Sequence, residues 1–107
     1  MRAKPLMLAV VIALEMPAGH GAGQEIGQSS RGLALAQRLC AECHAVQKEY
    51  SRSPKANAPR FQAIASIPGM TATALSAALN TSHRAMPNIL LAADEQADII
   101  AYILSLK

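Results

Sequence analysis

Cys40-Ala41-Glu42-Cys43-His44 is the most informative stretch of the 107-residue chain. It holds both cysteines and one of the three histidines, with the thiols three positions apart and the imidazole directly after the second. Thiols and imidazoles are side chains that bind metals and react covalently. The spacing therefore indicates a chemical site, and four kinds of site are compatible with it.

Three of these kinds fit the rest of the sequence poorly. A thioredoxin-like redox pair follows a strand in a βαβ unit, and no segment here alternates convincingly at period two. A structural zinc site takes four ligands; His83 could join the motif, but no second ligand pair follows at finger or ribbon spacing. A disulfide suits an oxidising compartment, but across so short a loop it would be strained and would restrain little of the chain.

The fourth kind is covalent haem attachment. Cys40 and Cys43, one turn apart on a helix, can each form a thioether with a vinyl group of the porphyrin. His44 then lies under the ring, where one of its nitrogens can reach the iron. Because each residue has a separate role, the sequence favours one covalently bound haem c over the other three interpretations.

The N-terminal part of the chain has the layout of a secretory signal. A basic start, an apolar run over residues 5–14 and small residues up to Gly23 predict a signal peptide over 1–23, cleaved after Gly23. The apolar run is too short to span a bilayer, which takes about 20 residues; an uncleaved anchor or a buried helix is the alternative. We expect a single domain over 24–107, in the periplasm of a bacterium and without stable insertion into the membrane.

The composition of residues 24–107 leaves room for a bound group. Eight basic and six acidic residues give a net charge of +2, without the basic runs typical of nucleic-acid binders. The whole chain has one Phe, two Tyr and no Trp, although aromatic side chains normally supply much of a core. A chain this small usually needs an additional source of stability, such as a disulfide or a bound metal. A bound apolar cofactor would meet that need.

Helical spacing of apolar residues predicts an all-α fold. Residues 24–29 form a loose polar lead-in, Ser30 is the expected N-cap of the first helix, and Thr71 is that of the third. The expected helices are 31–43, 60–65, 72–80 and 94–106. The residues expected to face inward are Gly32, Leu35, Ala36 and Leu39 in the first, Leu75, Ala78 and Leu79 in the third, and Ile99, Ile100, Ile103 and Leu104 in the last.

Haem iron held by a histidine takes Met, a second His or an open position on the opposite side. Residues 24–107 offer Met70, Met86 and His83. Met86 is favoured, because it lies in a separate loop stiffened by Pro87. A thioether opposite an imidazole fills both axial positions and raises the reduction potential. We therefore expect electron transfer, and no enzymatic activity on a substrate.

The chain resembles the small monohaem class I cytochromes c with His/Met ligation, over most of residues 31–106. "CAECH" gives Cys40 and Cys43 the thioether role and His44 the proximal-ligand role. "HRAMPNI" resembles the methionine loop of the family, which gives Met86 the distal role. The resemblance implies the cytochrome c fold, with the first and last helices crossing and short helices and loops around one covalently bound haem c.

Further residues carry this resemblance. Gly32 stands where the family has a glycine that allows the close helix crossing, and Ile99 and Tyr102 of "DIIAYILSL" stand on the face that meets it. Pro59 of "NAPRF" resembles the proline whose carbonyl accepts a hydrogen bond from the proximal histidine. The absence of tryptophan departs from the family, in which one often holds a haem propionate.

The resemblance implies a monomeric periplasmic carrier that passes single electrons between redox proteins such as a dehydrogenase, an oxidase or a reductase. Such encounters are transient and bury little surface, and Lys48, Lys55 and Arg84 could steer them. A different function would be that of the haem c subunit of a periplasmic dehydrogenase. A third, a gas or redox sensor, would need an open or labile sixth position.

Overall fold

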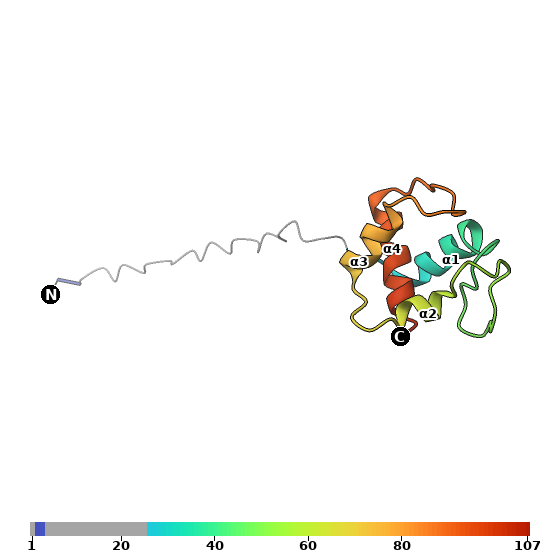
Figure 1. The fold of residues 1–107 in the computed structure, drawn as a ribbon. Helices are drawn as coiled ribbons and strands as arrows, with labels where there is room; N and C mark the ends of the chain where they lie inside the picture. Colours follow the sequence, from blue (N-terminus) through green and yellow to red (C-terminus); the bar gives the residue numbers. More distant parts are fainter. Residues whose placement is uncertain (1, 4–25) are drawn as a thin grey trace.

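The computed structural model describes residues 2–3 and 26–107. The expected signal peptide therefore lies outside the described residues, apart from Arg2 and Ala3. The described part contains four helices and no strand, so the all-α prediction is confirmed (Figure 1). The helices are α1 (Ser29–Leu39), α2 (Phe61–Ala65), α3 (Ala72–Leu79) and α4 (Ala93–Leu104). Over the same residues, none of the helices is long and apolar enough to cross a membrane.

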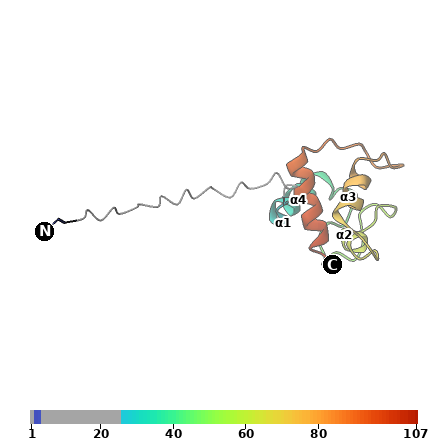
Figure 2. The same ribbon diagram turned by 90° about the vertical axis from the view of Figure 1, so that its left-hand side faces the viewer.

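α4 is the helix against which the other three pack (Figure 2). α1 makes most of these contacts, and it crosses α4 too closely for a side chain at the crossing point. A Cβ on Gly32 would lie 1.9 Å from the Asp98 carbonyl oxygen and 2.7 Å from the Cβ of Tyr102. The glycine crossing that the family resemblance implied is therefore confirmed.

The residues just before α1 also lie against α4. A Cβ on Gly27 would lie 1.8 Å from the Ala97 carbonyl oxygen. The Gln28 N–H donates to the Asp98 carboxylate at 2.7 Å. The prediction of a loose lead-in is wrong for these residues, because contacts with the backbone of α4 and with the Asp98 side chain hold them in place.

α1 begins earlier than the sequence indicated. Its N-cap is Gln28 instead of Ser30, and the Gly32 N–H closes the first turn by donating to the Gln28 carbonyl at 2.9 Å. Of the predicted span 31–43, the helix covers only the part up to Leu39. A serine is a common N-cap, but here the contacts of the preceding residues with α4 set the start.

The other helices lie within two residues of their predicted bounds, and the end of α2 and the start of α3 are as predicted. Thr71 Oγ1 accepts a backbone N–H from the first turn of α3 at 3.1 Å, as predicted for an N-cap. At the start of α4, the Glu95 carboxylate accepts the Ala92 N–H at 3.3 Å. Ala78 was expected to face inward and is exposed, because α3 is short and buries only Leu75 fully.

The buried core is mostly aliphatic and contains two aromatic side chains, Phe61 and Tyr102. The second tyrosine, Tyr50, is 57% exposed and contributes little to it. Ile99, Ile100 and Ile103 of α4 are buried as predicted. The core cluster consists of Leu35, Ala36, Val46, Phe61, Ala65, Leu75, Ile99, Ile100, Tyr102, Ile103 and Leu106.

Candidate haem site

Residues 40–44 form a single turn that follows α1. The backbone N–H groups of Cys43 and His44 both donate to the Cys40 carbonyl, at 3.2 and 2.9 Å. Cys40 leaves the helix with φ −120° and ψ −23°, and it shares the Ala36 carbonyl with the residue after it. The predicted continuation of the helix to Cys43 is wrong, because this shared acceptor ends the regular hydrogen bonding. The two thiols still lie one turn apart.

The Cys40 and Cys43 thiols are free and partly buried. Burial, with a smaller contribution from Cys43, raises the pKa of Cys40 to about 11. A reactive redox pair needs an accessible thiolate, so this environment does not favour that alternative. Over residues 2–3 and 26–107, no three Cys, His, Asp or Glu side chains are grouped to hold a metal ion.

His44 is oriented by the Pro59 carbonyl, which lies 2.7 Å from Nδ1. Since a carbonyl oxygen only accepts, Nδ1 carries the proton and Nε2 keeps its lone pair. The ring also packs against Phe61, with centroids 5.3 Å apart and planes tilted by 51°. This is the arrangement in which metal-binding histidines are held, with one nitrogen donating to the protein and the other directed to the metal.

Backbone hydrogen bonds bring Pro59 next to His44. The Phe61 N–H donates to the Ala45 carbonyl at 3.0 Å, and the Lys55 N–H donates to the Cys43 carbonyl at 3.1 Å. The segment over 47–60 thus folds back onto the Cys40–His44 turn. The contact with Pro59 depends on this return of the chain.

A recess lies between the end of α1, the end of α3, the loop over 80–92 and α4. Its lining is largely apolar, and Cys40, Met86 and His83 are among the lining residues. The lining residues are Leu39, Cys40, Leu79, Thr81, His83, Met86, Pro87, Asn88, Ile89, Leu91 and Ile99. Residues far apart in the sequence thereby share one apolar surface, which suits a flat apolar cofactor.

Of the three candidates for the second axial position, Met86 and His83 are in this lining. Met70 instead packs against the core cluster, and its carbonyl accepts from Lys107 Nζ at 3.0 Å. Met86 is half-buried and His83 is exposed. The structure therefore brings Cys40 and Met86 together on one surface, and His44 and Pro59 together by a hydrogen bond.

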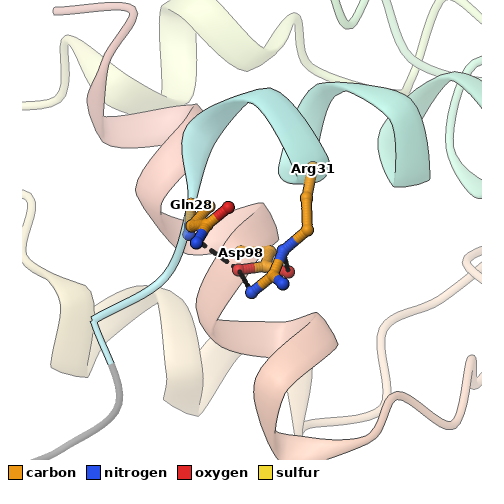
Figure 3. Close-up of polar contacts among 3 residues, drawn as sticks. All are labelled: Gln28, Arg31 and Asp98. Atoms are coloured by element: carbon orange, nitrogen blue, oxygen red, sulfur yellow. Dashed lines mark hydrogen bonds and ion pairs between the residues drawn. The ribbon is translucent and has the colours of Figure 1, made fainter.

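Sequence reasoning missed Asp98, a carboxylate of α4 that is only 4% exposed (Figure 3). Arg31 Nε lies 2.9 Å from one of its oxygens, and the Gln28 N–H donates to the other. The Gln28 hydrogen bond, aided by Arg31, holds the pKa of Asp98 below its usual value despite the opposing effect of burial. The only signal in the sequence is an acidic residue directly before the apolar run of the last helix.

Tyr102 connects α4 to the segment that follows His44. Its buried hydroxyl donates to the Val46 carbonyl, and burial, with a smaller effect of Glu49, raises its pKa. Val46 and Ala45 are themselves buried. α4 therefore carries one contact that positions α1 before the motif and another that positions the chain after it.

The family model described as Cytochrome c matches residues 29–107. The chain belongs to the cytochrome c family. Cytochrome c-552 of Bradyrhizobium diazoefficiens is 36% identical to this cytochrome c over 95 residues, which cover 89% of this chain and 80% of that protein. No solved structure matches the chain significantly.

As a small monohaem class I cytochrome c, the protein is an electron-transfer haem protein, and its cofactor is covalently bound haem c. The residues fit this group on structural grounds: two thiols one turn apart, an imidazole with its Nε2 lone pair available, and a thioether in an apolar recess. The two aromatic side chains of its described core also leave the interior suited to a large apolar group.

Proposed function

We propose that this cytochrome c is a periplasmic carrier that passes single electrons between redox proteins by cycling its iron between Fe(II) and Fe(III). Cys40 and Cys43 would form the thioethers, and His44 and Met86 would be the axial ligands. Pro59 would hold the His44 ring through its carbonyl. Haem c supplies the redox centre, and the polypeptide supplies attachment, ligands and an apolar surrounding.

The observation that carries this proposal is the hydrogen bond from His44 Nδ1 to the Pro59 carbonyl at 2.7 Å. It selects the tautomer in which Nε2 can bind iron, and it limits rotation of the ring. A ligand held in this way changes little in position when the iron changes its charge. Small structural change on oxidation and reduction is what fast electron transfer requires.

The proposed opposite ligand fits the same task. The Met86 sulfur is a soft, weak donor that stabilises ferrous iron relative to a second imidazole, and it therefore raises the reduction potential. With sulfur and nitrogen on the two axial positions, oxygen has no open site. The half-buried position of Met86 in an apolar recess also limits access of water.

The test is a visible spectrum of the exported protein, oxidised and reduced, before and after extraction with acid and acetone. We expect a low-spin haem spectrum, colour that stays with the polypeptide after extraction, and a weak charge-transfer band from sulfur near the red edge of the ferric spectrum. A colourless protein would contradict the presence of haem, and haem that extracts would contradict its covalent attachment. A missing sulfur band would contradict Met86 as a ligand.

The proposed periplasmic location rests on the signal-like layout of residues 1–23. Expression with those residues intact should give coloured protein in the periplasmic fraction, with a new N-terminus at Gln24. A protein that stays in the cytoplasm, or that keeps residues 1–23 and sediments with membranes, would overturn this part of the proposal.

A haem subunit of a dehydrogenase is the second candidate, favoured by exposed apolar side chains next to the recess. Leu90 is 96% exposed, and its sequence neighbours Ile89 and Leu91 line the recess. Apolar side chains of this kind are covered in a permanent complex and remain exposed in a carrier that docks transiently. Purification from the native host at mild ionic strength separates the two: a carrier elutes as a small monomer, and a subunit elutes with its enzyme.

A further inference from the structure

The loop over residues 80–92 carries two side chains that can bind iron. It connects α3 to α4 (Figure 1), and both His83 and Met86 line the recess that it borders. The proposed function uses Met86 only. His83 is therefore a metal-binding side chain next to the proposed haem surface without an assigned role.

His83 is held in the same way as His44. Its Nδ1 lies 2.7 Å from the Thr81 carbonyl, just as Nδ1 of His44 lies 2.7 Å from the Pro59 carbonyl. Since a carbonyl accepts only, Nδ1 of His83 carries the proton and Nε2 keeps the lone pair. A protein carbonyl that fixes the tautomer in this way is a regular feature of histidines that bind metals.

A tight turn joins the two side chains. The Met86 N–H donates to the His83 carbonyl at 3.3 Å, and Ala85 between them has φ +66°. A left-handed conformation is unfavourable for alanine. Opening the turn would therefore relieve the backbone strain at Ala85. His83 and Met86 lie in one turn between α3 and α4, so a change of ligand from Met86 to His83 would begin with a rearrangement of this turn.

We propose that His83 is a second axial ligand of the haem iron, supplied by the 80–92 loop when Met86 is not bound. The inference rests on the proposed function, in which Met86 is the first ligand. Imidazole nitrogen suits ferric iron better than a thioether does. The His83-bound form is therefore less disfavoured in the oxidised protein than in the reduced protein, although Met86 remains the main ligand in both, and it has a lower reduction potential than the Met86-bound form.

The experiment compares holoprotein variants at neutral pH. In Met86→Ala, we expect the ferric haem to lose the sulfur band and to stay low-spin, with His83 bound. In Met86→Ala/His83→Ala, we expect a high-spin ferric spectrum. Carbon monoxide should bind the ferrous double variant at least about tenfold faster than the single variant, because a closed sixth position reduces the binding-competent fraction.

The controls separate this inference from the proposed function. His83→Ala with Met86 present should keep the wild-type spectrum and its sulfur band, and loss of low-spin ligation there would contradict both proposals. Imidazole added to the double variant should restore a low-spin spectrum, which shows that its haem pocket is folded. A wild-type protein without the sulfur band would contradict Met86 as first ligand, whatever the variants show.

Three results would overturn the role of His83. First, Met86→Ala and Met86→Ala/His83→Ala could both be high-spin and bind carbon monoxide at equal rates, which would show that His83 does not bind the iron. They could both stay low-spin, so that another group binds. Low-spin ligation of Met86→Ala could also disappear on dilution, so that the ligand comes from a second molecule.

Discussion

At the scale of single residues, hydrogen bonds to backbone carbonyls position the side chains of the candidate site. Pro59 supplies the acceptor for His44, and Val46, two residues after His44, supplies the acceptor for Tyr102. Each bond joins segments that are distant in the sequence. The precision of the site therefore depends on where the backbone runs as well as on the side chains of the motif.

Tyr102→Phe is expected to lower the free energy of unfolding of the holoprotein by about 1–2 kcal/mol, because it leaves the Val46 carbonyl buried without its donor. Chemical denaturation followed by the haem absorbance and by circular dichroism measures the change. Tyr50→Phe is the matched control: that side chain is 57% exposed, so its loss of a hydroxyl should have almost no effect. Equal effects of the two substitutions would show that the Tyr102 hydrogen bond is unimportant.

Asp98 is expected to make stability depend on pH. Its pKa is lowered in the folded protein, so its contribution to stability is present above the unfolded value, near 3.9, and is lost as the pH falls through the lower folded value. Unfolding of the holoprotein should therefore become easier on acidification towards about pH 3, and Asp98→Asn should reduce that acid dependence. Asp94→Asn, exposed on the same helix, should keep it. If Asp98→Asn left the acid dependence unchanged, this carboxylate would not be its source.

At the scale of elements, the crossing of α1 and α4 determines where the motif lies. α1 ends at Leu39, immediately before Cys40, so any shift of α1 on α4 moves the first thiol. Gly32 and Gly27 allow the backbone of this segment to touch α4. The Arg31–Asp98 ion pair then fixes the direction in which α1 lies across α4.

Gly32→Ala is expected to destabilise the holoprotein by about 3 kcal/mol or more, because the added Cβ would overlap the Asp98 carbonyl oxygen 1.9 Å away and the helices would have to separate. Gly69→Ala is the control. Gly69 has φ +77° and open space around its Cβ position within the described structure, so its substitution costs only about 1 kcal/mol of backbone strain. Thermal unfolding of both variants measures the loss of stability. A smaller loss of stability for Gly32→Ala than for Gly69→Ala would contradict the tight crossing.

At the scale of the whole molecule, the four short helices of residues 26–107 enclose a small core. Helices of this length are unstable alone in water, and the described core has only Phe61 and Tyr102 as aromatic members. The longest helix, α4, has twelve residues and is contacted by the other three. Covalently bound haem c therefore supplies apolar contact that the side chains alone do not.

Cys40→Ala/Cys43→Ala is expected to yield a polypeptide that loses colour on extraction with acid and acetone. Without bound haem, its far-ultraviolet helix signal at 25 °C should fall by about half or more, because the remaining core does not offset the conformational entropy of the chain. Glu42→Ala inside the same motif, at an exposed position, should keep both colour and helix content. A double variant that stays fully helical without haem would contradict the structural role of the cofactor.

The sequence predicted much of the fold, because local patterns decide most helices. Thr71 as N-cap and the isoleucines of α4 were predicted and are observed. The first helix was placed too late and extended too far, because contacts of Gly27 and Gln28 with α4 and the shared Ala36 carbonyl set its ends. The contacts of Gly27 and Gln28 with α4 join residues about 70 positions apart and leave no local pattern.

For the candidate site, the sequence by itself determined the chemical groups: two thiols and an imidazole in one short motif, and a methionine in a later loop. Covalent attachment depends on the order of neighbouring residues, so a linear pattern is sufficient to predict it. The tertiary structure decided that the Thr81 carbonyl holds His83, that Asp98 is buried with Arg31, and that His83 shares a recess with Met86. Hydrogen bonds and burial depend on the distances between folded segments. The separation of residues along the sequence does not specify these distances.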